Sequence, residues 1–320
     1  MARTNISRIR EAMAARDLHP RSKWGQNFLK ERGILELIVR EAEVREGDLV
    51  VEIGSGPGCL TEELHRQGAK VLAVEIDSDL HEVARELLGT PHGVSWILAD
   101  VLSTKNSLNP SVVERIAEQR AETGSDGFKL VANLPYNVAV PVVVNLLESG
   151  LDWRTMVVMV QDELADRFLA GPKTPDYGLV SVLTALLARG ERVRRVAPTA
   201  FWPSPKVGST ILKLTPIGST YFNEITYEYF KAIAKGVFSQ RRKKWLKSLL
   251  SRSDASEKSF FEREMAQLGF DTNLRAETLS PDDIFNIAVA LSGLGYSTAE
   301  ENHRGRAASS AKSRRRGRRG

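Results

Sequence analysis

Asp48-Leu-Val-Val-Glu-Ile-Gly-Ser-Gly-Pro-Gly58 carries the strongest structural signal in this sequence of 320 residues. Residues 48–53 are mostly apolar and rich in β-branched side chains, which predicts a buried strand. Three glycines follow at every second position, and glycine adopts backbone conformations that let a loop approach a ligand closely. Such a loop at the carboxyl end of a first strand is typical of nucleotide-binding α/β sheets. The segment therefore predicts a strand, a ligand-binding loop and a helix that begins near Cys59.

Strands and helices are expected to alternate along the chain that follows. Strands are predicted at 48–53, 70–75, 94–99, 128–132 and 155–160, and helices at 31–43, 59–67, 79–88, 111–121 and 138–147. Alternation at this spacing predicts an α/β fold with a doubly wound, mostly parallel, Rossmann-like sheet that carries helices on both faces.

The pattern changes after about residue 215, where no further strand is expected. Helical stretches are predicted there at 227–240, 243–252, 257–268 and 282–291. We therefore predict a partly helical leader at 1–20, a sheet domain at 21–216, a small all-α domain at 217–296 and a tail at 297–320. The tail is rich in Arg, Ser, Gly and Ala and lacks large apolar residues, a composition typical of disorder.

The overall composition predicts a soluble protein of a reducing compartment. Apolar residues make up 42% and charged residues 27% of the chain, which is ordinary for a globular protein. The single cysteine, Cys59, excludes an internal disulfide. Residues 1–20 lack the apolar core of a secretory signal, and no apolar run reaches the length of about 18 residues that a membrane span needs. We expect a cytoplasmic protein with no membrane segment.

Positive charge is concentrated in a few places. The net charge is +5, but residues 304–320 hold eight Lys and Arg and no acidic residue, so the rest of the chain carries a net −3 (+5 less the +8 of the tail). Contact with RNA phosphates is the favoured interpretation of this tail, with a solubility tail or a localisation signal as alternatives. The cluster Arg192–Arg195 is explained as well by the solvated face of a strand as by contact with RNA phosphates.

Acidic residues at the ends of the next two strands predict the class of cofactor. Glu75 lies 21 residues after Gly54 and is suited to accept hydrogen bonds from both ribose hydroxyls. Asp100, at the end of the third strand, is suited to an adenine amine. The spacing G-x-G-x-G departs from the dinucleotide pattern, and acidic residues suit a cationic cofactor without a pyrophosphate. We therefore predict S-adenosylmethionine, held in part by Gly54 and Gly56.

The tetrapeptide Asn133-Leu134-Pro135-Tyr136 predicts the chemistry. It follows an apolar run, so it lies where a strand ends in a loop, and Pro135 has no N–H to compete for the carbonyl groups of the turn. The Asn133 side-chain carbonyl and a backbone carbonyl are suited to accept the hydrogens of an exocyclic amine, while Tyr136 offers a flat ring. Such acceptors position an adenine nitrogen for attack. By itself the tetrapeptide is equally well explained as a plain proline turn.

A series of motifs, in order, resembles the KsgA-type small-subunit ribosomal RNA adenine dimethyltransferases over most of residues 20–295. These motifs are Lys23-Trp24-Gly25-Gln26-Asn27-Phe28-Leu29, Glu52–Gly58, Val74-Glu75-Ile76-Asp77, Ala99-Asp100, Asn133–Tyr136, Met159-Val-Gln161-Asp-Glu163, Tyr177-Gly178, Phe201-Trp-Pro203-Ser-Pro205-Lys206-Val207 and Gln240-Arg241-Arg242-Lys243-Lys244. Trp24 replaces the usual Phe, Gly208 stands where Asp often follows, and 103–127 is longer than expected.

The resemblance implies a role for each matching residue. Asn27 and the Leu29 backbone are expected at the cofactor, with Gly54, Gly56, Glu75 and Asp100, while Asn133 spans cofactor and target amine. The backbone carbonyl of either Leu134 or Pro135 is expected to be the second acceptor, and Tyr136 and Phe201 are expected to stack on the target base. The basic residues expected to bind RNA phosphates are Arg241, Arg242, Lys243 and Lys244. None of these roles requires a metal.

The implied reaction is N6,N6-dimethylation of adjacent adenosines near the 3′ end of 16S ribosomal RNA during ribosome biogenesis. The expected partner is a pre-30S particle, and the protein is expected to act as a monomer. Three alternatives remain from sequence: a 23S ribosomal RNA methyltransferase of the macrolide-resistance type, a DNA adenine methyltransferase and a non-enzymatic factor on the same fold. The DNA enzymes more often carry Asp-Pro-Pro-Tyr or Asn-Pro-Pro-Tyr, and a non-enzymatic factor would have lost residues such as Glu75.

Overall fold

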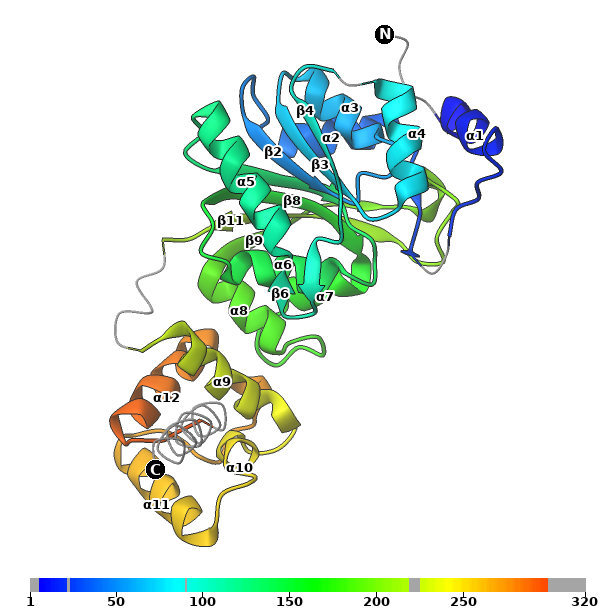
Figure 1. The fold of residues 1–320 in the computed structure, drawn as a ribbon. Helices are drawn as coiled ribbons and strands as arrows, with labels where there is room; N and C mark the ends of the chain where they lie inside the picture. The colour runs from blue at the N-terminus through cyan, green and yellow to red at the C-terminus, as the bar shows by residue number, and fades with distance from the viewer. Residues whose placement is uncertain (1–5, 22–23, 90, 219–224, 299–320) are drawn as a thin grey trace, which may run out of the picture. The chain divides into compact units, whose positions relative to one another are not determined.

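The computed structural model describes residues 6–21, 24–89, 91–218 and 225–298. The chain divides into two compact units (Figure 1). The first, called the sheet unit, comprises Met1–Leu169 and Leu187–Ile217, and the second, called the helical unit, comprises Ala170–Leu186 and Gly218–Gly320. No helix among the described residues is both long enough and apolar enough to cross a membrane.

The sheet unit is built on a seven-stranded sheet of order β4-β3-β2-β7-β8-β11-β9. The strands are β2 (Leu49–Ile53), β3 (Lys70–Glu75), β4 (Val94–Leu98), β7 (Phe128–Asn133), β8 (Trp153–Gln161), β9 (Ala188–Val196) and β11 (Ser209–Pro216). The first five run parallel, whereas β11 is antiparallel to both of its neighbours. The prediction of a doubly wound, mostly parallel sheet is confirmed, and each parallel strand begins and ends within two residues of its predicted bounds.

The order of the strands determines where a ligand can bind. The chain passes from β2 outward to β3 and β4, and then returns to form β7 on the other side of β2. At such a reversal the connections leave in opposite directions and open a crevice at the carboxyl ends of the strands. The glycine loop after β2, Glu75 at the end of β3 and Asn133 at the end of β7 all lie at this edge.

Helices cover both faces of the sheet (Figure 1). Apolar side chains of α2 (Arg32–Glu41) and α3 (Cys59–Arg66) pack with those of the strands in one continuous core, which buries Ile38 and Leu64 completely. On the opposite face lie α5 (Pro110–Thr123) and α6 (Ala139–Glu148). The long segment 103–127 is filled by α5 and by a small hairpin of β5 (Leu102–Thr104) and β6 (Ser107–Leu108).

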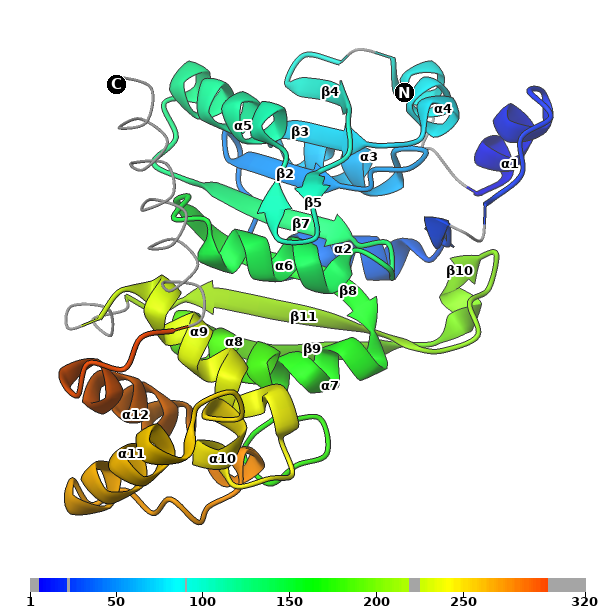
Figure 2. The same cartoon turned by 60° about the horizontal axis from the view of Figure 1, so that its bottom comes forward.

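The predicted leader at 1–20 is part of the sheet unit. Its helix α1 (Ile6–Ala14) lies beside α4 (Ser78–Leu88) (Figure 2). This helix is amphipathic, and its Ile9 and Met13 are buried in a cluster with Leu80 and Val83 of α4. The leader thus contains a helix, as its predicted partly helical character requires, and three apolar residues on one face of that helix supply a docking surface.

The helical unit contains α9 (Tyr227–Val237), α10 (Trp245–Leu249), α11 (Ala255–Gln267) and α12 (Pro281–Gly293). Residues 170–186, predicted to belong to the sheet domain, also belong to this unit. The Tyr177 hydroxyl donates to the Leu279 carbonyl at 2.7 Å, and the Tyr177 ring meets Phe238 edge to face. The predicted tail lies outside the described residues beyond Thr298.

Candidate active site

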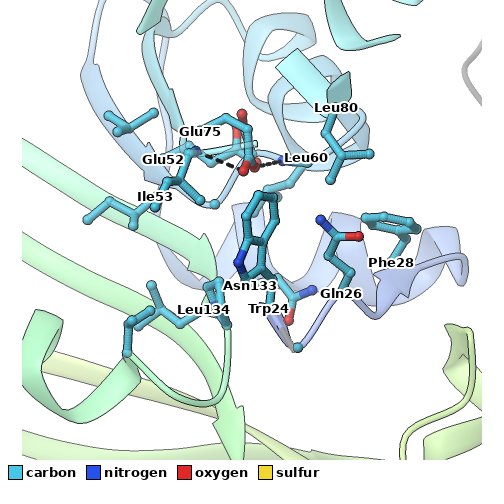
Figure 3. A pocket seen from close by; sticks show the side chains of 18 of the residues that line it. Trp24, Gln26, Phe28, Glu52, Ile53, Leu60, Glu75, Leu80, Asn133 and Leu134 are labelled. Carbon is cyan, nitrogen blue, oxygen red and sulfur yellow. Dashed lines mark hydrogen bonds between the residues drawn. The ribbon is translucent and has the colours of Figure 1, made fainter. Parts of the chain in front are cut away.

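A cavity of about 240 Å³ lies at the carboxyl ends of β2, β3 and β7 (Figure 3). Ten of the residues predicted for the cofactor or the chemistry line this cavity: Asn27, Leu29, Gly54, Gly56, Glu75, Asp100, Asn133, Leu134, Pro135 and Tyr136. The predicted residues that do not line it are Phe201 and the basic group 241–244. The topology thus brings together segments that are far apart in sequence, such as those of Asn27 and Asn133, which are 106 residues apart.

The glycine loop of this cavity depends on glycine at two positions. Gly54 and Gly56 have φ angles of 71° and 54°, in the region that side chains disfavour. A Cβ atom on Gly54 would lie 3.0 Å from the Pro135 ring, and one on Gly56 would lie 3.4 Å from the Phe28 ring. Glycine therefore lets the loop approach both the Asn133–Tyr136 turn and strand β1 (Phe28–Leu29).

Glu75 is buried at the end of β3 and held by backbone donors. Its Oε2 accepts from the Gly56 N–H at 2.7 Å, and its Oε1 accepts from the N–H groups of Ile76 and Asp77, each at 2.8 Å. Burial raises the pKa of Glu75, while the three N–H donors oppose that rise. The carboxylate is therefore fixed in orientation at the cavity wall, where it can accept further hydrogen bonds.

Glu52 is a second buried carboxyl at the cavity, and sequence reasoning assigned it no role. Its side chain is only 1% exposed, and its Oε2 accepts from the Thr61 hydroxyl at 2.5 Å. Burial raises its pKa to about 8, and the nearby Glu75 charge adds to the rise. An acidic residue inside an otherwise apolar strand is the sequence signal that identifies it. Near neutral pH Glu52 is mostly protonated, so it brings little charge to the cavity.

Asp100 differs from these two carboxyls because it is exposed. Its Oδ1 accepts from the Leu102 N–H at 2.9 Å, and its backbone carbonyl accepts from the Asn109 side chain at 2.8 Å. These bonds fix the loop after β4 and place an accessible carboxylate on the cavity rim.

The turn after β7 presents acceptor groups to the cavity. The Asn133 amide Nδ2 donates to the Asn27 carbonyl at 3.1 Å, which leaves Oδ1 as the atom of that side chain able to accept from a ligand. The Pro135 carbonyl accepts from the Val138 N–H at 3.1 Å. Of the two backbone carbonyls predicted for the role of second acceptor, that of Pro135 is therefore already engaged within the turn.

Tyr136 lines the cavity with its ring half-buried. Its hydroxyl lies 3.2 Å from the Ser209 hydroxyl, and burial raises the pKa of the phenol. The hydroxyl is thus tethered to β11 and remains neutral, so it does not act as a base.

Phe201 does not reach the cavity, which departs from its predicted place beside the base. Its ring is 2% exposed and belongs to the main core of the sheet unit. Strand β10 (Phe201–Trp202) pairs with β1, which places Phe201 opposite Leu29. In this conformation Phe201 supports the cavity wall from behind, and stacking on a base requires it to leave the core.

The basic residues 241–244 form a turn before α10, not the start of a helix. Arg241 is engaged inside the helical unit, where it contacts the Glu277 carboxylate at 3.3 Å and the Pro175 carbonyl. Lys244 contacts the Asn273 side chain, whereas Arg242 and Lys243 are exposed. Two of the four thus have structural contacts, and their predicted contact with RNA stays a prediction.

None of the residues of the cluster Arg192–Arg195 lines the cavity. Arg192, in the edge strand β9, pairs with Asp166 and donates to the Thr210 hydroxyl, which supports its interpretation as part of a strand face.

Among residues 6–21, 24–89, 91–218 and 225–298, no group of three or more His, Cys, Asp or Glu side chains is arranged to hold a metal ion. Lys23, the first residue of its motif, lies outside those ranges.

Comparisons with known proteins agree on one family. Residues 18–292 match the model of a family described as ribosomal RNA adenine dimethylase. Ribosomal RNA small subunit methyltransferase A of Ligilactobacillus salivarius is 37% identical, over 91% of this chain and 96% of the relative. The protein of the same name from Alkaliphilus oremlandii is 35% identical over 81% of this chain and 87% of the relative.

Solved structures show the same fold. A dimethyladenosine transferase from Plasmodium falciparum has a TM-score of 0.69 at 23% identity and covers 84% of this chain and 98% of its own. The 23S rRNA methyltransferase ErmE has a TM-score of 0.59 at 25% identity and covers 83% of this chain and all of its own. The first of these likenesses supports the fold alone, because its sequence identity is low.

Proposed function

The chain belongs to the ribosomal RNA adenine dimethylase family, and we propose that it methylates N6 of adenosines in small-subunit ribosomal RNA with S-adenosylmethionine as methyl donor. One observation carries the proposal: the Asn133–Tyr136 turn and the carboxylates of Glu75 and Asp100 line a single cavity. The turn is suited to an adenine amine, and the carboxylates are suited to the donor.

The residues of the cavity fit S-adenosylmethionine. Glycines at 54 and 56 leave space that a Cβ atom would fill, and Glu75 and Asp100 are acceptors for hydroxyl and amine groups. None of the described residues that line the cavity is a Lys or Arg of the kind that binds a phosphate. Apolar side chains of Leu60 and Ile76 complete the walls. When bound, the donor supplies an electrophilic methyl group on a positively charged sulfur.

The chain's own groups position the acceptor nitrogen. Asn133 Oδ1 and the Leu134 carbonyl accept the two hydrogens of the amine, which directs the nitrogen lone pair away from the ring. The bond from Asn133 Nδ2 to the Asn27 carbonyl holds the amide in the orientation this requires. Attack in line on the methyl group needs no strong base, because the methylated amine loses its proton readily. Catalysis in this proposal is positioning in a preorganised site.

Access to an adenine amine requires the base to leave its stack. Extrusion of a base costs a few kcal/mol, and stacking on an aromatic side chain returns roughly 1–3 kcal/mol per base. Tyr136 lines the cavity and is the aromatic side chain proposed to receive the base. Phe201 is proposed as its partner only if the 201–202 segment moves on RNA binding, because its ring is now in the core.

Methylation of the large subunit is the alternative. ErmE supports it, with 25% identity and a TM-score of 0.59. The small subunit is favoured because relatives named for small-subunit methylation reach 35–37% identity over most of the chain.

The finer proposals are that two adjacent adenosines near the 3′ end of 16S RNA are dimethylated on a pre-30S particle, in the cytoplasm, by a monomer. Light scattering of the full-length protein tests the monomer.

The deciding experiment maps methyl groups on RNA. Purified protein and S-adenosylmethionine are incubated separately with small and large ribosomal subunits from cells that lack the corresponding methylases, and N6-methylated adenosines are located by mass spectrometry. We expect dimethyladenosine in small-subunit RNA with the wild type, and methyl transfer slower by about 10²–10³-fold with Asn133→Ala. Methylation confined to large-subunit RNA would overturn the choice of substrate, and methylation of neither would overturn the activity.

A further inference from the structure

We propose that Arg21 is a positioning residue that latches the segment Trp24–Asn27, called here the strap, to the cofactor-binding end of β3. The proposal rests on the proposed function, because the ligand that the strap would enclose is S-adenosylmethionine. Arg21 lies outside every motif used to predict the site, and it does not line the cavity itself. It acts through the side chains that it holds.

Arg21 contacts two carboxylates at the start of α4. Its Nη1 lies 3.2 Å from Asp77 Oδ2, and its Nη2 lies 2.6 Å from Asp79 Oδ2. The Asp77 side chain is only 3% exposed, whereas the Arg21 side chain is 40% exposed, so the acidic end of this pair is shielded from solvent. A guanidinium can bridge two carboxylates at once because its donors point in fixed, diverging directions.

The same residue also holds the strap. The Arg21 guanidinium lies 5.1 Å from the centre of the Trp24 ring, within the range of a cation–π contact. The Arg21 backbone N–H donates to Gln26 Oε1 at 2.6 Å, and Gln26 Nε2 donates to Asp77 Oδ2 at 2.7 Å. All four strap residues line the cavity, and in Figure 3 the Trp24 indole stands between Asn133 and the pair Glu52 and Glu75.

The latch connects the two halves of the site. On one side, the N–H of Asp77 donates to Glu75 Oε1, the carboxylate proposed to hold the ribose. On the other side, the Asn27 carbonyl at the end of the strap accepts from Asn133 Nδ2. A strap held at Asp77 therefore fixes the cavity wall and, through Asn27, the orientation of the Asn133 amide. Release of Arg21 should loosen both.

A second ion pair offers a matched control. Arg16 pairs with Glu86, also on α4, and its side chain is 35% exposed, close to the 40% of Arg21. Both arginines thus tie the N-terminal segment to the same helix, but Arg16 contacts neither the strap nor Asp77. Arg21→Gln and Arg16→Gln remove one charge each and differ in whether the strap is affected.

The experiment compares wild type, Arg21→Gln and Arg16→Gln as full-length proteins. Hydrogen exchange of the amides of 24–29 is measured without ligand, and binding of S-adenosylmethionine and S-adenosylhomocysteine is measured by calorimetry and stopped flow. For Arg21→Gln we expect faster exchange in the strap, and affinity weaker by roughly three- to tenfold through faster dissociation. Arg16→Gln should leave both at wild-type values, and Arg21→Lys should restore only part of the affinity.

Each result decides a separate point. Unchanged exchange in Arg21→Gln would overturn the latch, and faster exchange with unchanged affinity would overturn the positioning role. An equal effect of Arg16→Gln would mean that any anchor of the N-terminal segment suffices, which also overturns the proposal. If the wild type binds neither ligand, the proposed function fails, and the positioning role for a methyl donor fails with it, whereas the exchange data still report whether the latch exists.

Discussion

Replacing Glu52 with Gln should remove a large part of the pH dependence of this protein's stability. The pKa of Glu52 is about 8 in the folded protein because of burial, against an ordinary value of 4.5 in the unfolded chain. Between these values the folded state binds a proton that the unfolded state has released. The free energy of unfolding therefore falls as the pH rises through this window. Gln resembles the protonated carboxyl in shape and has no acidic proton to lose.

The size of the effect follows from the two pKa values. Each pKa unit is worth about 1.4 kcal/mol, so the rise from 4.5 to about 8 sets an upper limit of about 5 kcal/mol. Within the window the contribution of Glu52 approaches a slope of about −1.4 kcal/mol per pH unit, the value for one full proton. Local hydration of the charged group makes the measured loss smaller than the limit.

The measurement is denaturant unfolding of wild type and Glu52→Gln between about pH 5 and pH 8.5. We expect the variant to gain stability relative to the wild type as the pH rises. Glu63→Gln is the control, because Glu63 is a buried carboxyl of α3 that pairs with Arg66 at 2.6 Å. If the difference between wild type and Glu52→Gln is the same at both ends of the range, Glu52 does not titrate as its burial requires.

Three further changes test the proposed site. Asn133→Ala should slow methyl transfer about 10²–10³-fold, as expected for one transition-state hydrogen-bonding group, with cofactor affinity in calorimetry nearly intact. Glu75→Ala should weaken S-adenosylmethionine binding by about 1.5–3 kcal/mol per hydrogen bond lost, and unchanged affinity would place the ribose elsewhere. Removing 304–320, with its eight Lys and Arg, should reduce the salt dependence of RNA binding by roughly 0.7–0.9 per lost phosphate contact without altering the methylated positions.

The parallel strands were predictable from sequence because each is a short apolar run bounded by glycine or by an acidic residue. Such local boundaries place β2 and β3, with their functional ends at Gly54 and Glu75, almost to the residue. Since parallel strands bring their carboxyl ends to one edge, the gathering of these residues with Asn133 was also predictable.

Non-local pairing explains what sequence reasoning missed. A phenylalanine at position 201 is as compatible with the core as with the wall of a pocket. Only its pairing with Leu29 across β1 and β10 determines where its ring lies. Arg241 belongs to a basic run, and nothing local indicates its contacts with Glu277 and Pro175. The latch at Arg21 likewise depends on Asp77, which is 56 residues away.

The assignment of 170–186 to the helical unit means that the polypeptide enters that unit twice. A chain truncated near residue 217 would keep Tyr177 but lose Leu279 and Phe238, its hydrogen-bond and ring partners. An isolated fragment from 218 onward would lack the same contacts from the other side. The two units are therefore not modules that one cut can separate. Chimeras that exchange the C-terminal region between relatives should exchange 170–186 with it, or carry a mismatched surface around that tyrosine.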